Sequence, residues 1–416
     1  MSDSLKDRVA ASFLPHPPEK LGLAVSGGSD STGLLYLLHE IADDYSIDLS
    51  VVTVDHGFRV EAIREIAHVA ARCAELDVNH TVLRWRDWDG QGNKQDAARR
   101  ARYALMTDWA KARQIQTMAL GHTSDDQAET VLMRLARGSG VDGLTAMVPR
   151  RIKNGVVWLR PLLGTGREEL RDYLNQRGIS WCDDPTNEDD RYDRIKARKA
   201  LAILKPLGID ASSLGQVASN MSRARDALDW QAFLEARKMV KVRAGALAID
   251  WRGYRTLPDE IARRLLVNAL LWIGGAEYPP RRRSVAQAMD LLKNTPSATL
   301  EGCMLRRIDD TLWIFRELNA VAQHRTPISE PWDGRWEATG PDTDDDNLQM
   351  APLGEEGILL CPFWRDEGLP RDLLTASPAI WSGATLVAAP LAGFAQGWST
   401  TIAKGEDAFF AALLSH

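Results

Sequence analysis

Two polar strings contain residue types that can bind phosphate and move protons. The first, S-G-G-S-D-S, combines two glycines with three hydroxyls and one carboxylate. Glycine lets the backbone approach a ligand closely, and the N–H groups of a turn that opens a helix form an anion site. The lysine of a Walker loop and the G-x-G-x-x-G pattern are both absent. The string predicts a phosphate loop made by Ser26, Gly27, Gly28, Ser29, Asp30 and Ser31.

Asp30 is unusual in such a loop, because a carboxylate repels phosphate unless it holds Mg²⁺ or faces the reacting groups. We therefore predict a metal-binding or catalytic role for Asp30. The simpler structural interpretation is a serine-rich helix cap whose aspartate accepts hydrogen bonds from backbone donors. The position of the complete string directly after an apolar run favours the phosphate loop.

The second string, G-H-T-S-D-D-Q-A-E-T at residues 121–130, brings three carboxylates into the first turns of a predicted helix. Glu129 lies three residues after Asp126 and four after Asp125, so the three share a helix face. Such a cluster can bind an ammonium group, hold Mg²⁺ or take a proton from an attacking amine. A capping box with a solvated face is the simpler alternative. His122 and Asp55 at neighbouring strand ends favour the functional interpretation.

Histidines and arginines surround these strings. His56 and His122 each follow a predicted strand, so both are expected to point into the crevice that holds Ser26. Arg137 precedes the Gly138-Ser139-Gly140 turn, which offers a second anion nest. Arg137 and three further arginines are expected to form a positive wall for ATP or tRNA phosphates: Arg99, Arg102 and Arg134. A solvated helix face explains Arg99 and Arg102 equally well.

Short apolar runs alternate with helical patterns through the first two hundred residues. The predicted strands are residues 21–25, 49–54, 78–85 and 116–120, and the predicted helices are 31–41, 61–76, 94–113 and 125–137. This alternation predicts an α/β fold, a doubly wound parallel sheet with helices on both faces. The polar strings follow the strands, where such sheets bind their ligands.

The remaining chain has a different pattern, and 416 residues are too many for one typical core. Helices are predicted at residues 211–242, 258–272 and 284–292, and a strand pair within 298–317. A polar stretch rich in proline and aspartate, residues 326–347, predicts a linker. We expect three domains: a catalytic domain at residues 1–205, a mainly helical domain at 206–325 and a small mixed α/β or β domain at 326–416.

Charge and cysteine usage narrow the function classes. The net charge is −6, but residues 329–416 carry 4 basic and 14 acidic residues, which leaves the rest at +4. A local basic patch can bind nucleic acid despite a negative total. No apolar run suits a membrane span, and four scattered cysteines without a C-x-x-C pattern argue against a zinc site and fit a reducing cytoplasm.

The string S-G-G-x-D-S resembles the pyrophosphate loop of the N-type ATP pyrophosphatases, whose fold is adenine nucleotide alpha hydrolase-like. Other strings resemble the lysidine synthases in that superfamily, in the same order along residues 20–205. They are V-D-H-G-F-R at 54–59, the basic helix at 95–103, G-H-T-S-D-D-Q-A-E-T at 121–130, R-x-x-R-G-S-G at 134–140, R-P-L-L at 160–163, Trp181, D-P-T-N at 184–187 and Arg194.

The resemblance implies a reaction, its substrates and a set of site residues. ATP would adenylate the wobble cytidine of a minor isoleucine tRNA with a CAU anticodon, and free lysine would displace AMP to form lysidine, with Mg²⁺ on the phosphates. It implies catalytic roles for Asp30, Asp126, Glu129 and His122, with lysine bound by Asp126 and Glu129. It further implies ATP contacts from the phosphate loop, Asp55, His56 and Arg137, metal contacts from Asp30 and Asp125, and tRNA contacts from Arg99, Arg102, Arg194 and Arg198. A cytoplasmic enzyme is expected, with a homodimer among the open oligomeric states.

Two positions depart from the family pattern. Thr123 replaces the second histidine of G-H-H, and Ile195 replaces the asparagine after Arg194. Two alternatives stay open: another tRNA-modifying enzyme of the superfamily, such as a thiolase, and a protein that binds ATP or tRNA without catalysis. A thiolase needs paired cysteines, which the spacing does not offer, and the intact Asp30, Asp126 and Glu129 argue against loss of catalysis.

Overall fold

The computed structural model describes residues 4–57, 62–86, 88, 94–182, 193–342 and 347–414. The chain forms two units, Met1–Arg225 and Asp226–His416, and passes from one to the other within helix α9 (Ala211–Met239). The division into three domains stays a prediction. Two predicted motif segments, residues 58–59 and 184–187, lie outside the described residues.

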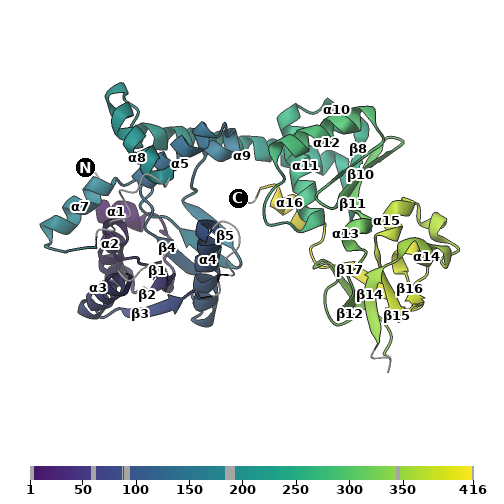
Figure 1. The fold of residues 1–416 in the computed structure, drawn as a ribbon, viewed down its shortest axis with the longest axis horizontal. Coiled ribbons are helices and arrows are strands. Elements are labelled where there is room, and N and C mark those ends of the chain that lie inside the picture. The colour runs from purple at the N-terminus through teal and green to yellow at the C-terminus, as the bar shows by residue number, and fades with distance from the viewer. Residues whose placement is uncertain are drawn as a thin grey trace. The chain divides into compact units, whose positions relative to one another are not determined.

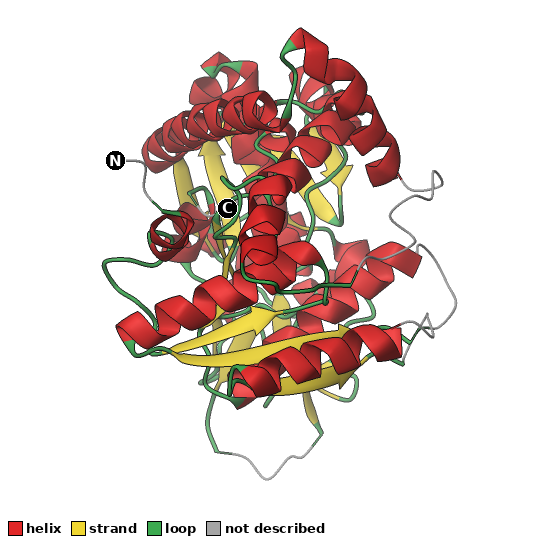
Figure 2. Cartoon of the chain, turned by 90° about the vertical axis from the view of Figure 1, so that its left-hand side faces the viewer, coloured by secondary structure: helices red, strands yellow, loops and turns green. Residues whose placement is uncertain are grey.

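The first unit is built on a six-stranded sheet in the order β3-β2-β1-β4-β6-β5. Five strands are parallel, and β5 pairs antiparallel with β6 at the edge. The predicted doubly wound α/β fold is confirmed, and Figure 2 shows helices on both sides of this sheet. The strands are β1 (Lys20–Ala24), β2 (Asp48–Asp55), β3 (Asn79–Arg84), β4 (Thr117–Leu120), β5 (Arg150–Lys153) and β6 (Val156–Leu159).

Alternation along the strands explains the two helical layers, because successive side chains point to opposite faces. Leu21 and Leu23 pack in a core with α1 (Leu5–Ala10), α2 (Ser29–Tyr45), α3 (Ala62–Glu75) and α7 (Arg167–Gln176). Ala24 and Trp158 pack instead in a core with α4 (Lys94–Ala112). Figure 1 shows α2 and α3 on one side of the strands and α4 on the other.

The position of β1 decides where a ligand can bind. The chain runs from β1 outward to β2 and β3, and then returns to place β4 on the other side of β1. The connections after β1 and β4 therefore diverge to opposite sides, which opens a crevice at the carboxyl ends of these two strands. Helices α2 and α5 (Ser124–Ala136) begin at this crevice.

The second unit carries a five-stranded antiparallel sheet in the order β7-β8-β11-β10-β9. The predicted helices are confirmed as α9, α11 (Asp259–Gly274) and α12 (Arg282–Asn294), although residues 240–242 belong to β7 rather than to α9. The strands are β7 (Val240–Arg243), β8 (Ala246–Asp250), β9 (Ser297–Leu300), β10 (Cys303–Ile308) and β11 (Thr311–Arg316). Of these five strands, the sequence predicted the pair β10 and β11.

The predicted linker at residues 326–347 is wrong for the described part of that segment. Trp332 is fully buried, and Trp336 begins β13 (Trp336–Thr339), which pairs with β17 (Ser399–Ile402). The prolines and aspartates that suggested a linker surround two tryptophans that pack in a small core with Val321 and Met350.

A second sheet in this unit has the order β12-β14-β15-β16. Its strands are β12 (Thr326–Pro327), β14 (Leu348–Pro352), β15 (Pro378–Ser382) and β16 (Thr385–Ala388). Helix α16 (Glu406–Ala412) packs elsewhere in the unit. Its Phe409 and Phe410 lie in the core that α11 and the five-stranded sheet form. No helix in the described part of the chain is both long and apolar enough to cross a membrane.

Candidate functional site

The phosphate loop, residues 26–31, leaves β1 and opens α2. Gly27 has φ +93°, a conformation that glycine adopts without strain. The Ser31 hydroxyl donates to the Gly28 carbonyl at 3.2 Å and accepts from the Ser26 N–H at 3.1 Å, so the loop is braced from within. No side chain in the described part of the chain caps the N-terminus of α2. Its first N–H groups and the positive end of the helix dipole are therefore available to an anion.

Gly121 lets the end of β4 lie directly against this loop. A Cβ atom at Gly121 would meet three backbone atoms, the Ser31 Cα at 3.1 Å and the Asp30 carbonyl oxygen and Ser31 nitrogen at 3.2 Å. Backbone atoms cannot rotate away as a side chain does. The glycine thus sets the distance between the two strings that the sequence singled out.

We expect Gly121→Ala to raise the KM for ATP at least about tenfold and to destabilise the first unit by about 1–3 kcal/mol, because the added methyl group displaces the phosphate loop. The measurements are ATP–pyrophosphate exchange and urea unfolding. Gly405→Ala is the control, since its Cβ would meet nothing within 4 Å and the residue belongs to the second unit. Equal behaviour of the two variants would show that the close approach is not required.

A cavity of about 270 Å³ lies beside the phosphate loop at the ends of β1 and β2. Ser26, Asp55 and His56, three residues predicted to contact ATP, line it. The Asp55 carboxylate accepts the Gly57 N–H at 2.8 Å, which holds the turn after β2. Arg102, predicted on the tRNA side, lines this cavity too.

The three carboxylates of the second string occupy the start of α5. Thr123 caps this helix in a capping box, since its N–H donates to Asp126 Oδ2 at 2.9 Å. The capping box is therefore real, but its face is not solvated. Asp126 is 8% exposed and Glu129 is 1% exposed. A buried carboxylate must be compensated by cations or by a proton.

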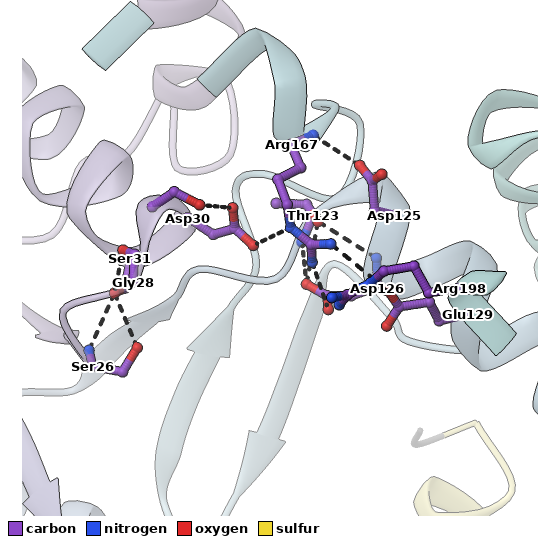
Figure 3. Close-up of polar contacts among 11 residues, drawn as sticks. Ser26, Gly28, Asp30, Ser31, Thr123, Asp125, Asp126, Glu129, Arg167 and Arg198 are labelled. Atoms are coloured by element: carbon purple, nitrogen blue, oxygen red, sulfur yellow. Dashed lines mark hydrogen bonds and ion pairs between the residues drawn. The ribbon is translucent and has the colours of Figure 1, made fainter. Parts of the chain in front are cut away.

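Arg167, at the first position of α7, joins the phosphate loop to this acidic helix (Figure 3). Its Nε donates to Asp30 Oδ2 at 3.0 Å, and its Nη2 lies 3.4 Å from Asp126 Oδ1. Its Nη1 lies 3.7 Å from Glu129 Oε1. On the other side, Arg198 Nε donates to the same Glu129 oxygen at 2.9 Å. Asp30, Asp126 and Glu129 thus form one cluster, although Asp30 is about 100 positions from the other two.

Sequence reasoning missed Arg167. It lies a few residues after R-P-L-L at 160–163, in the stretch G-T-G-R, which carries no pattern of its own. A signal was available, because two glycines and Glu168-Glu169 mark the start of a helix here. Arg167 is then a basic residue at the first helical position, where the helix dipole disfavours positive charge. A cation in that position calls for a nearby anion.

Asp125 contributes differently from its neighbours. Its Oδ2 accepts the backbone N–H of Arg167 at 2.8 Å, so it fastens the start of α7 to the start of α5. Within the described ranges, no group of three or more His, Cys, Asp or Glu side chains is arranged to hold a metal ion by itself. A metal at this site would take most of its ligands from elsewhere.

Electrostatics in the cluster favours added positive charge. Burial raises the pKa of Glu129, and Arg198 only partly opposes this shift. Burial likewise raises the pKa of Asp30 against the effect of Arg167. The Glu129 Oε2 atom is buried and has no hydrogen-bond partner among the described residues. Three carboxylates, those of Asp30, Asp126 and Glu129, contact two guanidinium groups, and Asp125 adds a fourth carboxylate beside them. This excess of negative charge suits a site that receives a cation.

His122 lies just after β4, between the strand and the acidic helix. Burial, reinforced by neighbouring arginines and opposed by Asp126, lowers the pKa of His122 to about 3. Its Nδ1 is buried without a hydrogen-bond partner in the described part of the chain. The imidazole is therefore neutral at physiological pH and can exchange a hydrogen bond with a ligand.

This histidine should make the protein sensitive to acid. The unfolded chain takes up a proton near pH 6.5, whereas the folded chain does so only near pH 3, so stability falls as the pH drops through this window. Relative to His122→Gln, we expect the wild type to lose about 1.4 kcal/mol of unfolding free energy per pH unit below 6. Urea unfolding at pH 5 and pH 8 measures the difference. Parallel losses in both proteins would contradict a buried neutral imidazole.

Three of the remaining predicted arginines, Arg99, Arg137 and Arg194, are exposed, whereas Arg134 is half-buried and donates to the Gly143 and Ala146 carbonyls. Arg137 is exposed and pairs with Asp193 at 2.9 Å, outside the lining of either cavity described for this unit. Arg99 lies over the Tyr103 ring at 5.9 Å. Arg194 is exposed at the start of α8 (Asp193–Leu204), and the neighbouring Ile195 is buried. The departure at Ile195 therefore places an apolar side chain in the core rather than an amide at the surface.

A larger cavity, about 950 Å³, lies on the other side of the acidic cluster. Residues from α5, α7, α8 and α9 line it, and Glu129, Arg167 and Arg198 lie in its wall. The cluster thus separates the phosphate loop from a space large enough for an amino acid or a nucleotide.

Comparisons with known proteins agree with this geometry. Residues 1–204 match the family model of the PP-loop domain. The chain is 52% identical over 415 residues to a tRNA(Ile)-lysidine synthase of Ruegeria pomeroyi, in an alignment that covers 100% of this chain and 99% of that protein. It is 32% identical to the protein of the same name from Wolbachia pipientis wMel, in an alignment that covers 89% of this chain and 88% of that protein. It is also 32% identical to the one from Anaplasma marginale, where the alignment covers 92% of this chain and 88% of that protein.

Proposed function

The chain belongs to the tRNA(Ile)-lysidine synthase family, and from this membership we propose that it uses ATP to join free L-lysine to C2 of the wobble cytidine of an isoleucine tRNA with a CAU anticodon. One observation carries the proposal. A single guanidinium, that of Arg167, contacts both Asp30 of the phosphate loop and Asp126 of the acidic helix. An anion site and an amine-binding site are therefore within the reach of one side chain.

The first half-reaction uses the phosphate loop. The cytidine O2 attacks the α-phosphorus of ATP, an O–P bond forms, and pyrophosphate leaves with the electron pair of the broken bond. The uncapped N-terminus of α2 stabilises the negative charge that develops on the phosphates. The cavity beside Asp55 and His56 supports a nucleoside position next to them. The cytosine must leave its stack to reach the loop, as bases in anticodon loops can.

The second half-reaction uses the acidic helix. The ε-ammonium of lysine must lose a proton before its nitrogen can attack C2 and expel AMP. Glu129 suits this step, because burial raises its pKa and one of its oxygens has no partner in the described structure. Asp126 would hold the ammonium beside it. The proton moves to Glu129, and AMP leaves with the electrons of the C2–O bond.

Mg²⁺ fits the site as a shared ligand of ATP and protein. Mg²⁺ commonly takes one or two carboxylates together with substrate phosphates, which agrees with Asp30 at the start of α2 and with the lack of an all-protein cluster among the described residues. When bound, it would neutralise phosphate charge. Asp125 is a further candidate, since one of its oxygens accepts the Arg167 backbone N–H, whereas both oxygens of Asp30 accept side-chain hydrogen bonds, from Ser29 and from Arg167.

The second unit offers a basic feature for the tRNA. Arg281, Arg282 and Arg283 are exposed at the start of α12, and none forms an ion pair with a described residue. Cations at a helix N-terminus oppose the dipole, so the fold itself gains little from them. They support a contact with RNA phosphates that compensates this cost. The alternative of a thiolase is not favoured, because all four cysteines are single and three are buried.

The proposal is tested by incubating the protein with ATP, Mg²⁺, radiolabelled lysine and total tRNA. We expect label that precipitates with acid, resists mild base and appears on a cytidine after nuclease digestion. Label that mild base removes would indicate an ester at the tRNA end and contradict the proposal. Pyrophosphate exchange without any label would keep the adenylating site and exclude lysine as the nucleophile.

A further inference from the structure

Arg167 is a cation that already occupies the place where the proposed function needs one. Its guanidinium contacts Asp30, Asp126 and Glu129, and its side chain is 16% exposed (Figure 3). Burial alone would lower the pKa of Arg167, but Asp30 and Asp126 outweigh this effect and raise it. The side chain is therefore a permanent internal counter-ion of the cluster.

The contacts of the Arg167 guanidinium are shorter with Asp30 than with the two carboxylates of the acidic helix. The contacts with Asp30 and Asp126 are hydrogen bonds of 3.0 Å and 3.4 Å, whereas Arg167 Nη1 lies 3.7 Å from Glu129 Oε1. The last distance exceeds that of a hydrogen bond. Glu129 has a shorter contact, 2.9 Å, with Arg198. An incoming cation would therefore displace Arg167 more easily from the acidic helix than from Asp30.

The backbone of Arg167 is fixed, while its side chain has room to move. The Arg167 N–H donates to Asp125 Oδ2 at 2.8 Å, and the Ser124 N–H donates to the Thr165 carbonyl at 2.9 Å. These bonds tie the start of α7 to the start of α5. Arg167 also lines the cavity of about 950 Å³. Rotation about the side-chain bonds can carry the guanidinium into that space without a change in the backbone.

We propose that Arg167 is a positioning residue that holds Asp126 and Glu129 in the substrate-free protein and yields them to the ammonium group of lysine while it keeps Asp30. This inference rests on the proposed function, which assigns the two carboxylates to lysine. Both cations compete for Asp126 Oδ1, because the Thr123 N–H already occupies Oδ2. A lysine ammonium at the unpartnered Glu129 Oε2 would also lie close to the guanidinium, and the two positive charges repel each other. Arg167 stabilises the empty cluster and lowers the apparent affinity for lysine.

The loss of apparent affinity for lysine depends on the fraction of substrate-free molecules in which Arg167 contacts the acidic helix. If Arg167 contacts the acidic helix in about 90% of substrate-free molecules, the apparent Kd for lysine is about ten times the intrinsic value. Removing the guanidinium should then tighten lysine binding, an unusual result for the loss of a residue in an active site. A residue with only a structural role would weaken lysine binding or leave it unchanged when replaced.

The test compares the steady-state KM for lysine in the wild type, Arg167→Gln and Arg167→Lys, with saturating ATP and tRNA at pH 8. We expect the KM for lysine to fall about five- to tenfold in Arg167→Gln and about two- to threefold in Arg167→Lys, whose single ammonium group holds fewer oxygens at once. The KM for ATP should change less than twofold. Guanidinium chloride at low millimolar concentration should raise the KM for lysine in Arg167→Gln towards the wild-type value, because it refills the vacated position.

Arg177→Gln is the matched control. It lies at the other end of α7, pairs with the single carboxylate of Glu40 and should leave the KM for lysine unchanged. An unchanged or higher KM for lysine in Arg167→Lys overturns the inference, even if Arg167→Gln does not fold. A wild type that transfers no lysine overturns the proposed function instead, so the two failures are distinguishable.

Discussion

Replacing Glu129 by Gln should lower the rate of lysine transfer by about 10²–10⁴-fold and leave ATP–pyrophosphate exchange in the presence of tRNA nearly intact. Glutamine keeps the shape of the side chain and an oxygen for Arg198, which donates to Glu129 Oε1 at 2.9 Å. It cannot accept the proton that the lysine ammonium must lose. The loss is therefore confined to the second half-reaction.

The pH dependence gives this prediction a second readout. Burial raises the pKa of Glu129, so lysine transfer by the wild type should increase with pH as this carboxyl ionises. The Glu129→Gln variant should lack that limb. Glu169→Gln, on the exposed face of α7 and paired with Arg8, is the control with the same chemical change and no expected effect. Equal losses of exchange and transfer in Glu129→Gln would contradict the assignment of Glu129 to the amine.

The phosphate loop and the ends of the strands were predictable from the sequence because their signals are local. A strand of apolar residues, two glycines and a helix start occur within about ten positions, and the backbone conformation of Gly27 follows from them. The order of the strands around β1 follows from the same alternation together with the usual rules for parallel sheets. Ser26, Asp55 and His56 consequently line one cavity, as expected.

Arg167 and Arg198 show what local patterns cannot give. Arg167 meets Asp30 across 137 positions, and Arg198 meets Glu129 across 69. No periodicity links such residues, because tertiary packing alone brings α7 and α8 to the start of α5. The same holds for Trp332, which lies in a polar stretch and is buried in a core that includes Val321, more than ten positions before it, and Met350, more than ten positions after it. The departure at Thr123, in contrast, has a local explanation, since a threonine caps α5 well.

Replacing Asp30 by Asn should lower both half-reactions, pyrophosphate exchange and lysine transfer, by about 10²–10³-fold. Asp30 lies in the first turn of α2, and its carboxylate accepts from the Ser29 hydroxyl at 3.0 Å and from Arg167 at 3.0 Å. Asparagine is of the same size and keeps an acceptor, but it loses the charge. The charge matters because the same position is proposed to share Mg²⁺ with the phosphates.

Mg²⁺ titration tests this reason directly. The Mg²⁺ concentration for half-maximal exchange should rise at least about tenfold in Asp30→Asn, whereas it should not change in Glu129→Gln. A shift of similar size in both variants would mean that one carboxylate cluster binds the ion as a whole. Loss of lysine transfer alone in Asp30→Asn would place this residue with the amine instead. The two substitutions together therefore decide whether Arg167 joins two chemically distinct sites, one at Asp30 and one at Glu129. If the sites are distinct, loss of the charge at Asp30 and loss of the charge at Glu129 affect different steps.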